Sequence, residues 1–277
     1  MLAEAVNGSA SVVAALQRAS AATGSDFHYL LCTAMRESSL KPQAQSSTSS
    51  AAGLFQFVEQ TWYGLVKTYG AKHGLGSYAG AIGQGADGRY HTGNASDRQA
   101  ILALRNDPQV SALMAGEYAR QTQTEMQASL GRGVCGGELY AAHFLGADAA
   151  CRLIHLTSSA PDTVAAKIFP QAASANKTVF YRGDGTPKTV REVYDWALRQ
   201  PSVGGLPSSS TPAATGVAAY STAGTVDYAD LIASMWTRST TGFFPSERGE
   251  SSSSPFLLSP GVLDILSSPV AKKLDGS

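Results

Sequence analysis

The spacing of apolar residues over the first 200 positions predicts a chain made almost wholly of helices. Between positions 27 and 38 the apolar residues recur three, four, seven and eight places apart, so they share one helical face; they are Phe27, Leu30, Leu31, Ala34 and Met35. Ser25 is a suitable N-cap for this helix, with Asp26 in its first turn. We expect the helix to end near Ser38, where the chain becomes polar.

Similar patterns predict helices over most of the remaining positions and hence a mainly α fold. We expect them from Ser9 or Ser11 to about Ala21, and over Glu59–Tyr69, Asp97–Arg105, Asp107–Leu130, Gly136–Leu145, Asp148–Ser158, a segment that starts at Pro161-Asp162, and Thr189–Arg199. Asp107 and Pro108 form an N-cap and N1 pair. The glycine-rich stretch Gly70–Gly93 is predicted to be a long loop or lid, and a short hairpin is expected near Phe180–Lys188.

The composition changes beyond about Gln200. Positions 201–225 are rich in Ser, Gly, Pro, Ala and Thr, which is typical of a disordered linker. Two short apolar segments follow, over 228–236 and 255–266. We therefore divide the chain into a folded domain, residues 1–200, and a flexible tail, residues 201–277. Short apolar segments in such a tail often dock on a partner and order on binding; the alternatives are that they fold back on the domain or have no binding role.

Composition narrows the class of protein. A chain of 277 residues can bury a substantial core, and its formal net charge of zero gives no argument for binding nucleic acid. No run of about 18 apolar residues predicts a membrane span. The N-terminus has the acidic Glu4 and no basic start, so it is a poor signal peptide.

The cysteines give little evidence for disulfides or for a metal site. They are Cys32, Cys135 and Cys151, and an odd number cannot pair completely within one chain. The sequence allows two alternatives, a disulfide between Cys135 and Cys151 or three free, buried thiols. No Cys/His spacing resembles a zinc site, so we expect no metal.

Glu37 is the candidate catalytic residue. It lies near the edge of the apolar face of the 27–38 helix, about one turn beyond Ala34. A carboxyl group at such an edge is partly buried, and burial disfavours its charged form, as general acid catalysis requires. A glutamate at a helix end is more often a solvated surface residue, but here a polar loop and the turn Gly53-Leu54-Phe55-Gln56 follow it.

This combination resembles a known family. Glu37-Ser38, Ser46 and Gly53–Gln56 are similar to the Glu-Ser and Gly-Leu-Met-Gln motifs of the soluble lytic transglycosylases. The likeness covers about residues 8 to 200 and continues through Thr61-Trp62, Gly137–Tyr140, Ala142–Gly146, Phe169-Pro170, Ala175–Lys177 and Tyr194. Within this family, the sequence resembles an alphaproteobacterial branch associated with flagella or secretion machines. The resemblance implies a lysozyme-like helical fold related to goose-type lysozyme.

The resemblance also implies a reaction. Glu37 would protonate the β-1,4 bond between N-acetylmuramic acid and N-acetylglucosamine in peptidoglycan, and then, as a carboxylate, deprotonate the muramyl 6-hydroxyl to close a 1,6-anhydro ring. Ordinary glycosidases use two carboxylates. Glu59, Asp87 and Glu117 are present, but nothing in the sequence places any of them opposite Glu37. No cofactor is implied.

The same resemblance assigns substrate binding to several further residues, which are Ser38, Ser46, Gly53, Leu54, Gln56, His143 and Tyr181. Ser46 would orient the acetamido group, with Ser47 as the alternative. His143 stands where the family has a tyrosine, and its imidazole can hydrogen-bond a sugar or Glu37. Tyr194 is the alternative to Tyr181 as the late cleft tyrosine.

Two other functions remain open at this point. One is a hydrolytic muramidase of the goose-lysozyme type; the other is a wall-binding or assembly scaffold with a residual lytic fold. The expected partners are peptidoglycan strands and, through residues 201–277, a flagellar or secretion-system protein, with no nucleic acid and no membrane span. An enzyme of this type finds its substrate in the periplasm.

Overall fold

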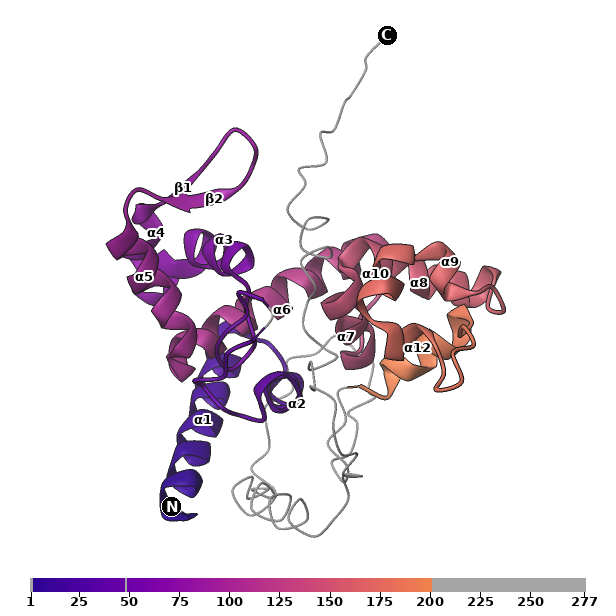
Figure 1. The fold of residues 1–277 in the computed structure, drawn as a ribbon, viewed down its shortest axis with the longest axis horizontal. Coiled ribbons are helices and arrows are strands. Elements are labelled where there is room, and N and C mark those ends of the chain that lie inside the picture. Colours follow the sequence, from indigo (N-terminus) through magenta and orange to yellow (C-terminus); the bar gives the residue numbers. More distant parts are fainter. Residues whose placement is uncertain (1, 48, 201–277) are drawn as a thin grey trace.

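The computed structural model describes residues 2–47 and 49–200 of the protein. Helices dominate it (Figure 1), which confirms the prediction of a mainly α fold. The longer helices are α1 (Leu2–Thr23), α2 (Phe27–Ser38), α3 (Glu59–Tyr69), α5 (Ala95–Ala103), α6 (Pro108–Leu130), α7 (Gly136–Leu145), α8 (Ala147–Ser159) and α12 (Val190–Leu198). The shorter elements are η1 (Gly70–His73), α4 (Gly76–Ala81), η2 (Leu104–Asn106), α9 (Ala165–Ile168), α10 (Pro170–Ala175), α11 (Lys177–Phe180) and the strands β1 (Ile82–Gln84) and β2 (Tyr90–Thr92).

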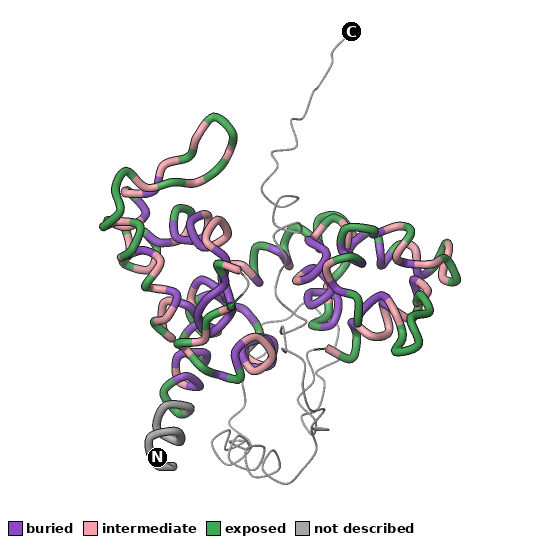
Figure 2. Tube along the Cα trace, viewed as in Figure 1, coloured by how far each residue is buried: buried purple, intermediate pink, exposed green. Residues whose placement is uncertain are grey.

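The long helix α6 runs through the middle of the molecule. Figure 1 shows α1 to α5 and the β1–β2 hairpin on one side of it and α7 to α12 on the other. Helices α1 and α2 pack against α6, and α7 packs against α8 and α12. Figure 2 shows buried positions on both sides of α6, whereas exposed and intermediate positions follow the hairpin turn. The core therefore extends over both halves, and α2 and α7 belong to different halves.

Helix α2 forms much as the pattern predicts. It buries Leu30, Leu31 and Ala34 on its inner face and ends at Ser38, followed by Ser39 at φ 52°. Its N-cap is Asp26, whose carboxylate accepts the Tyr29 N–H at 2.6 Å, so the choice of Ser25 as N-cap is wrong by one residue. The predicted bounds of α3, α6 and α7 are confirmed.

The prediction of a loop over Gly70–Gly93 is wrong. This stretch forms η1, α4 and the antiparallel β1–β2 hairpin, in which Ile82 pairs with Thr92. The hairpin is held by Gln60 of α3, whose side chain donates to the Tyr90 carbonyl oxygen and accepts from the Tyr90 N–H, each at 2.9 Å. A side chain from a neighbouring helix, which local composition does not reveal, thus stabilises the strand.

Two helix starts also differ from the prediction. Helix α1 begins at Leu2 rather than at Ser9 or Ser11. No helix begins at Pro161-Asp162, because Thr163 and Ala165 share backbone hydrogen bonds with Val190 (2.8 Å) and Lys188 (3.0 Å) instead. The short hairpin expected near Phe180–Lys188 is confirmed by a bridge between Tyr181 and Pro187.

None of the three cysteines, all of which lie in the described residues, forms a disulfide. Cys32 and Cys151 are buried, as expected, but Cys135 is exposed just before α7, so the option of a Cys135–Cys151 bridge is wrong. The predictions of a flexible tail and of its docking segments fall on residues 201–277, outside the described residues.

Candidate active site

Glu37 lies in the last turn of α2 with its side chain almost wholly buried. The side chain is 4% exposed, and its Oε1 atom lies 3.1 Å from Nε2 of His143 on α7. The two residues are 106 positions apart in the chain. The interpretation of Glu37 as a solvated helix-end residue is therefore wrong, and one of the two contacts expected of the imidazole is observed.

An aromatic stack supports His143. Its ring lies parallel to that of Tyr140, with ring centroids 5.6 Å apart and planes inclined by 16°. The guanidinium of Arg36 lies 5.1 Å from the centre of the Tyr140 ring and 5.5 Å from that of Trp196 on α12, and it donates to Gln200. Burial raises the pKa of Tyr140, so its ring stays a neutral phenol. The stack fixes the imidazole opposite Glu37.

The start of α7 is anchored by Glu138, which is 2% exposed. Its carboxylate accepts from Arg132 at 2.6 and 2.9 Å, from the Cys135 N–H at 3.1 Å and from the Tyr194 hydroxyl at 2.9 Å. Burial alone would raise the pKa of Glu138, but these hydrogen bonds outweigh it and hold the pKa below its ordinary value. This anchor lies about a turn and a half before His143. The three-residue spacing of Cys135 and Glu138, that of a capping box, could have revealed it in the sequence.

Ser38 joins α2 to the turn that follows the polar loop. Its hydroxyl lies 2.8 Å from the Leu54 carbonyl oxygen and 3.0 Å from that of Ala34, and its single proton can be donated to one of them at a time. Ser38 is buried. Its hydroxyl therefore positions the turn behind Glu37.

The turn itself depends on Gly53 and Gln56. Gly53 has φ +82°, and a Cβ atom there would lie 2.0 Å from the Arg105 carbonyl oxygen, so no other residue fits without movement of the backbone. Gln56 is 6% exposed and donates to the carbonyl oxygens of Gly53 (2.9 Å) and Ala44 (3.1 Å). Leu54 is fully buried. These residues shape the wall of the site from within.

Arg105 is a residue that the sequence did not reveal. Its Nη1 donates to the carbonyl oxygens of Ser50 (2.6 Å) and Phe57 (2.9 Å), which flank the turn. These two carbonyl oxygens lie 55 and 48 positions away in the chain, so no local pattern reveals that Arg105 holds the turn. Burial lowers the pKa of its guanidinium.

The observed hydrogen bonds and bridges of the remaining predicted residues, within the described part of the chain, are with groups other than Glu37. Ser46 is half-buried, and its hydroxyl accepts the Ser49 N–H at 3.1 Å; Ser47 is exposed. Tyr181 packs on the core beside its bridge to Pro187, and Tyr194 donates to Glu138. Over residues 2–47 and 49–200, neither tyrosine hydrogen-bonds Glu37.

The other carboxylates named from the sequence have partners elsewhere. Glu59 accepts from Arg98 at 2.6 and 3.0 Å. Asp87 accepts the Arg89 N–H at 3.0 Å in the hairpin turn. None of these contacts, nor those of Glu117 described next, involves Glu37 in the part of the chain that the structure describes.

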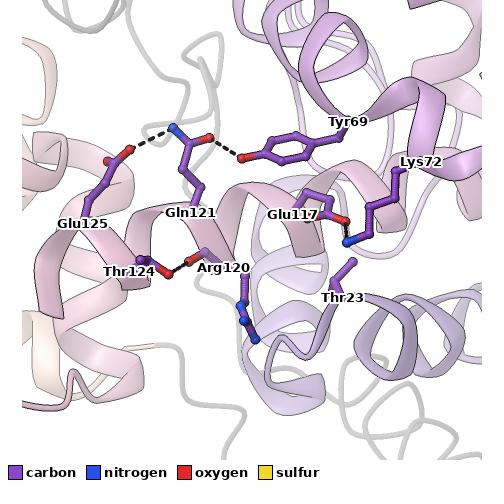
Figure 3. Close-up of a pocket in the computed structure, with 8 residues that line it drawn as sticks. All are labelled: Thr23, Tyr69, Lys72, Glu117, Arg120, Gln121, Thr124 and Glu125. Atoms are coloured by element: carbon purple, nitrogen blue, oxygen red, sulfur yellow. Dashed lines mark hydrogen bonds and ion pairs between the residues drawn. The ribbon is translucent and has the colours of Figure 1, made fainter. Parts of the chain in front are cut away.

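Glu117 lines a separate polar pocket of about 480 Å³ between α1, α3, η1 and α6 (Figure 3). Its carboxylate accepts from Lys72 at 2.6 Å and from Nε2 of His73 at 2.7 Å. Burial alone would raise the pKa of Glu117, but these donors outweigh it and lower the pKa. Thr23, which also lines the pocket, lies just before α2, whereas Glu37 lies about 15 Å from the start of α2 along the helix axis. The pocket is therefore distinct from the site around Glu37.

Membrane-spanning helices and metal-binding clusters are both absent from the described residues. Over residues 2–47 and 49–200, no helix has both the length and the apolar character needed to cross a membrane. Within the same ranges, no three His, Cys, Asp or Glu side chains come together as ligands for a metal ion.

A comparison with protein families agrees with the geometry. Residues 14–78 match the model of the transglycosylase SLT domain. This segment contains Glu37, Ser38, Ser46 and the Gly53–Gln56 turn, whereas His143 lies beyond it. The match supports a lysozyme-like domain and a peptidoglycan-cleaving activity of the lytic-transglycosylase type.

Proposed function

We propose that this protein is a peptidoglycan lytic transglycosylase that uses Glu37 as its single acid and base. The observation that carries the proposal is the buried carboxyl group of Glu37, which lies within the SLT match and has Nε2 of His143 at 3.1 Å. Ser38, Gly53 and Gln56, which hold one wall of this site, belong to the motifs that resemble the family.

The proposed reaction has two steps. Glu37 donates its proton to the oxygen that links N-acetylmuramic acid to N-acetylglucosamine, and the bond from that oxygen to the muramyl C1 breaks. The substrate's acetamido group stabilises the positive charge that develops at C1. The Glu37 carboxylate then takes the proton of the muramyl 6-hydroxyl, whose oxygen bonds to C1 and closes the anhydro ring. Glu37 regains its proton, and no water is consumed.

The partners of the other carboxylates favour this single-acid scheme. A hydrolytic glycosidase of the ordinary kind needs a second carboxylate across the bond. Glu59, Asp87 and Glu117 each accept hydrogen bonds from groups other than Glu37. The scheme needs no partner beyond the substrate's own hydroxyl.

The remaining roles of the site residues form part of the proposal. Ser46, with Ser47 as the alternative, would orient the acetamido group from the loop next to the Gly53–Gln56 turn. Tyr181 would contact the sugar from the second half of the molecule. Gly53, Leu54 and Gln56 would act as a rigid wall, because their polar groups are already bound within the protein.

Substitution of Glu37 by Gln tests the proposal. The amide keeps the shape and a hydrogen bond to His143 but cannot donate a proton, so clearing of purified peptidoglycan should fall by about 10²–10⁴-fold. Glu125→Gln is the matched control, because Glu125 is exposed and accepts from Gln121 on α6. Wild-type clearing by Glu37→Gln, with normal clearing by the control, would refute the assignment.

We also propose a cellular role for this activity. The enzyme would open the wall locally in the periplasm during assembly of an envelope machine such as a flagellum, recruited by the apolar segments of residues 201–277. A protein truncated after Gln200 should cleave purified wall as the full chain does but lose its recruitment. Recruitment of the truncated protein would refute the docking role.

A further inference from the structure

Arg36 joins the two halves of the molecule next to the candidate acid. It precedes Glu37 on α2, in the first half, whereas the rings that it contacts, Tyr140 and Trp196, lie on α7 and α12 in the second half (Figure 1). We propose that Arg36 is a positioning residue, which holds α7 against α2 and thereby sets where His143 lies relative to Glu37. Its effect on cleavage rests on the proposed function, but its effect on the position of His143 can be measured without cleavage.

The guanidinium of Arg36 makes three contacts with the second half. It lies 5.1 Å from the centre of the Tyr140 ring and 5.5 Å from that of the Trp196 ring, and a cation at such distances is attracted to the faces of aromatic rings. Its Nη1 also donates to the side chain of Gln200, 164 positions away and just after α12. Because Arg36 is half-buried, water weakens these attractions less than on an open surface.

The rings that receive Arg36 belong to a packed aromatic cluster. The rings of Tyr140 and Trp196 have centroids 6.1 Å apart. Phe144 packs edge-on against Trp196 at 5.6 Å and against Phe180 at 6.4 Å. Tyr140 and Phe180 are almost completely buried. The cluster ties α7 to α11 and α12, so Arg36 holds α7 through a close-packed group of side chains.

Tyr140 connects the guanidinium to the imidazole. It lies three residues before His143, so the two side chains are neighbours on the surface of α7, and their rings are stacked with centroids 5.6 Å apart. Glu37, next to Arg36 in the chain, has the imidazole at 3.1 Å. Two adjacent residues of α2 thus contact two residues about one turn apart on α7, and a shift of one contact moves the other.

A guanidinium suits this place better than an ammonium group. It is planar, so it can lie on a ring while the N–H groups at its edge donate to Gln200. Arg36→Lys would keep the positive charge but lose the planar group. Arg36→Met would keep an unbranched stem and lose the charge as well. A comparison of the two variants therefore separates charge from shape.

The first test is a double-mutant cycle on the rate of peptidoglycan clearing. We expect Arg36→Met to lose about tenfold and Arg36→Lys to lose less. In a His143→Ala background, Arg36→Met should lose less than about twofold further, because the imidazole that it positions is absent. A tenfold loss in both backgrounds would mean a merely structural role and would overturn the proposal.

Arg18→Met is the matched control for the cycle. Arg18 on α1 also donates to a glutamine of another helix, Gln109 of α6, at 2.9 Å, but it is exposed. We expect this variant to clear peptidoglycan as the wild type does. An equal loss in Arg18→Met and Arg36→Met would show that any such contact between helices matters as much, and would overturn the specific role of Arg36.

The second test needs no cleavage. In NMR spectra of the full-length protein at one fixed pH, the imidazole signals of His143 are identified by their loss in His143→Gln, and the stacked Tyr140 ring makes them sensitive to the position of the imidazole. We expect these signals to move in Arg36→Met and in Arg36→Lys but not in Arg18→Met. Because Arg36→Lys keeps the charge, movement in that variant reports a change of geometry.

The two possible failures can be told apart. His143 signals that do not move in Arg36→Lys would overturn the positioning role. Signals that move as expected, in a wild-type protein that does not cleave peptidoglycan, would retain the positioning role and refute the proposed function.

Discussion

The hydroxyl of Ser38 lies 2.8 Å from the carbonyl oxygen of Leu54, and this contact joins the helix that carries Glu37 to the turn that forms the wall beside it. Both residues are buried. The position of the acid and the position of the wall are therefore linked by one hydrogen bond.

Ser38→Ala should remove this link. Loss of a buried hydrogen bond should lower the free energy of unfolding by about 1–2 kcal/mol, and peptidoglycan clearing should slow because the wall moves relative to Glu37. Ser159→Ala is the matched control, since Ser159 is an exposed helix-end serine that also bonds the carbonyl oxygen four residues earlier. Chemical denaturation should show a change within about 0.5 kcal/mol for the control. Equal effects of the two substitutions would contradict the role of Ser38.

Gly53→Ala should be more destabilising than its conformation alone explains. Gly53 and Gly185 have nearly the same φ, +82° and +81°. A Cβ atom at Gly53 would lie 2.0 Å from the Arg105 carbonyl oxygen, whereas a Cβ atom at Gly185 would have no neighbouring heavy atom within 4 Å. We expect Gly185→Ala to cost about 1–2 kcal/mol and Gly53→Ala about 3 kcal/mol or more. Similar unfolding free energies for the two variants would show that the turn adapts.

Glu117 should contribute stability that depends on pH. Because its pKa in the folded protein is lowered, the contribution is present above the ordinary value of 4.5 and is lost as the pH falls through the folded value. We expect Glu117→Gln to destabilise the protein by about 1–2 kcal/mol at neutral pH, and by progressively less below about pH 4.5. Denaturation at several pH values measures this, with Glu125→Gln as the exposed control. A constant difference between Glu117→Gln and wild type at all pH values would contradict the explanation.

The two late tyrosines should separate stability from activity. Tyr194→Phe removes a hydrogen bond to the buried Glu138, so we expect a loss of about 1 kcal/mol of stability. Tyr181→Phe should leave stability within about 0.5 kcal/mol but slow peptidoglycan clearing, if Tyr181 contacts the sugar as proposed. Slower clearing by Tyr194→Phe at full stability, with normal clearing by Tyr181→Phe, would reverse the assignment.

The sequence predicted the helices that are determined by residues close together in the chain. The spacing of Leu30, Leu31 and Ala34 and the Asp107-Pro108 pair were sufficient to place α2 and the start of α6. The β1–β2 hairpin was missed because its support comes from Gln60, on another element.

Within the candidate site, too, the residues in short motifs could be predicted, whereas the residues that act through distant contacts could not. Glu37 and its turn follow from short motifs, and a bond between Glu37 and His143 was foreseen as one of two options. Arg105 holds the turn through backbone atoms far away in the chain, and no pattern of side chains encodes those contacts. The anchor formed by Glu138 was missed although its capping-box spacing was visible.

The central claim is that Glu37 alone serves as acid and then as base. The most direct measurement is mass spectrometry of the fragments that the full-length protein releases from purified peptidoglycan, with Glu37→Gln as the blank. The account predicts muramyl ends lighter by one water than a reducing sugar, which are absent with Glu37→Gln. Release of reducing muramyl ends by the wild-type protein would contradict it and would identify a hydrolytic muramidase instead.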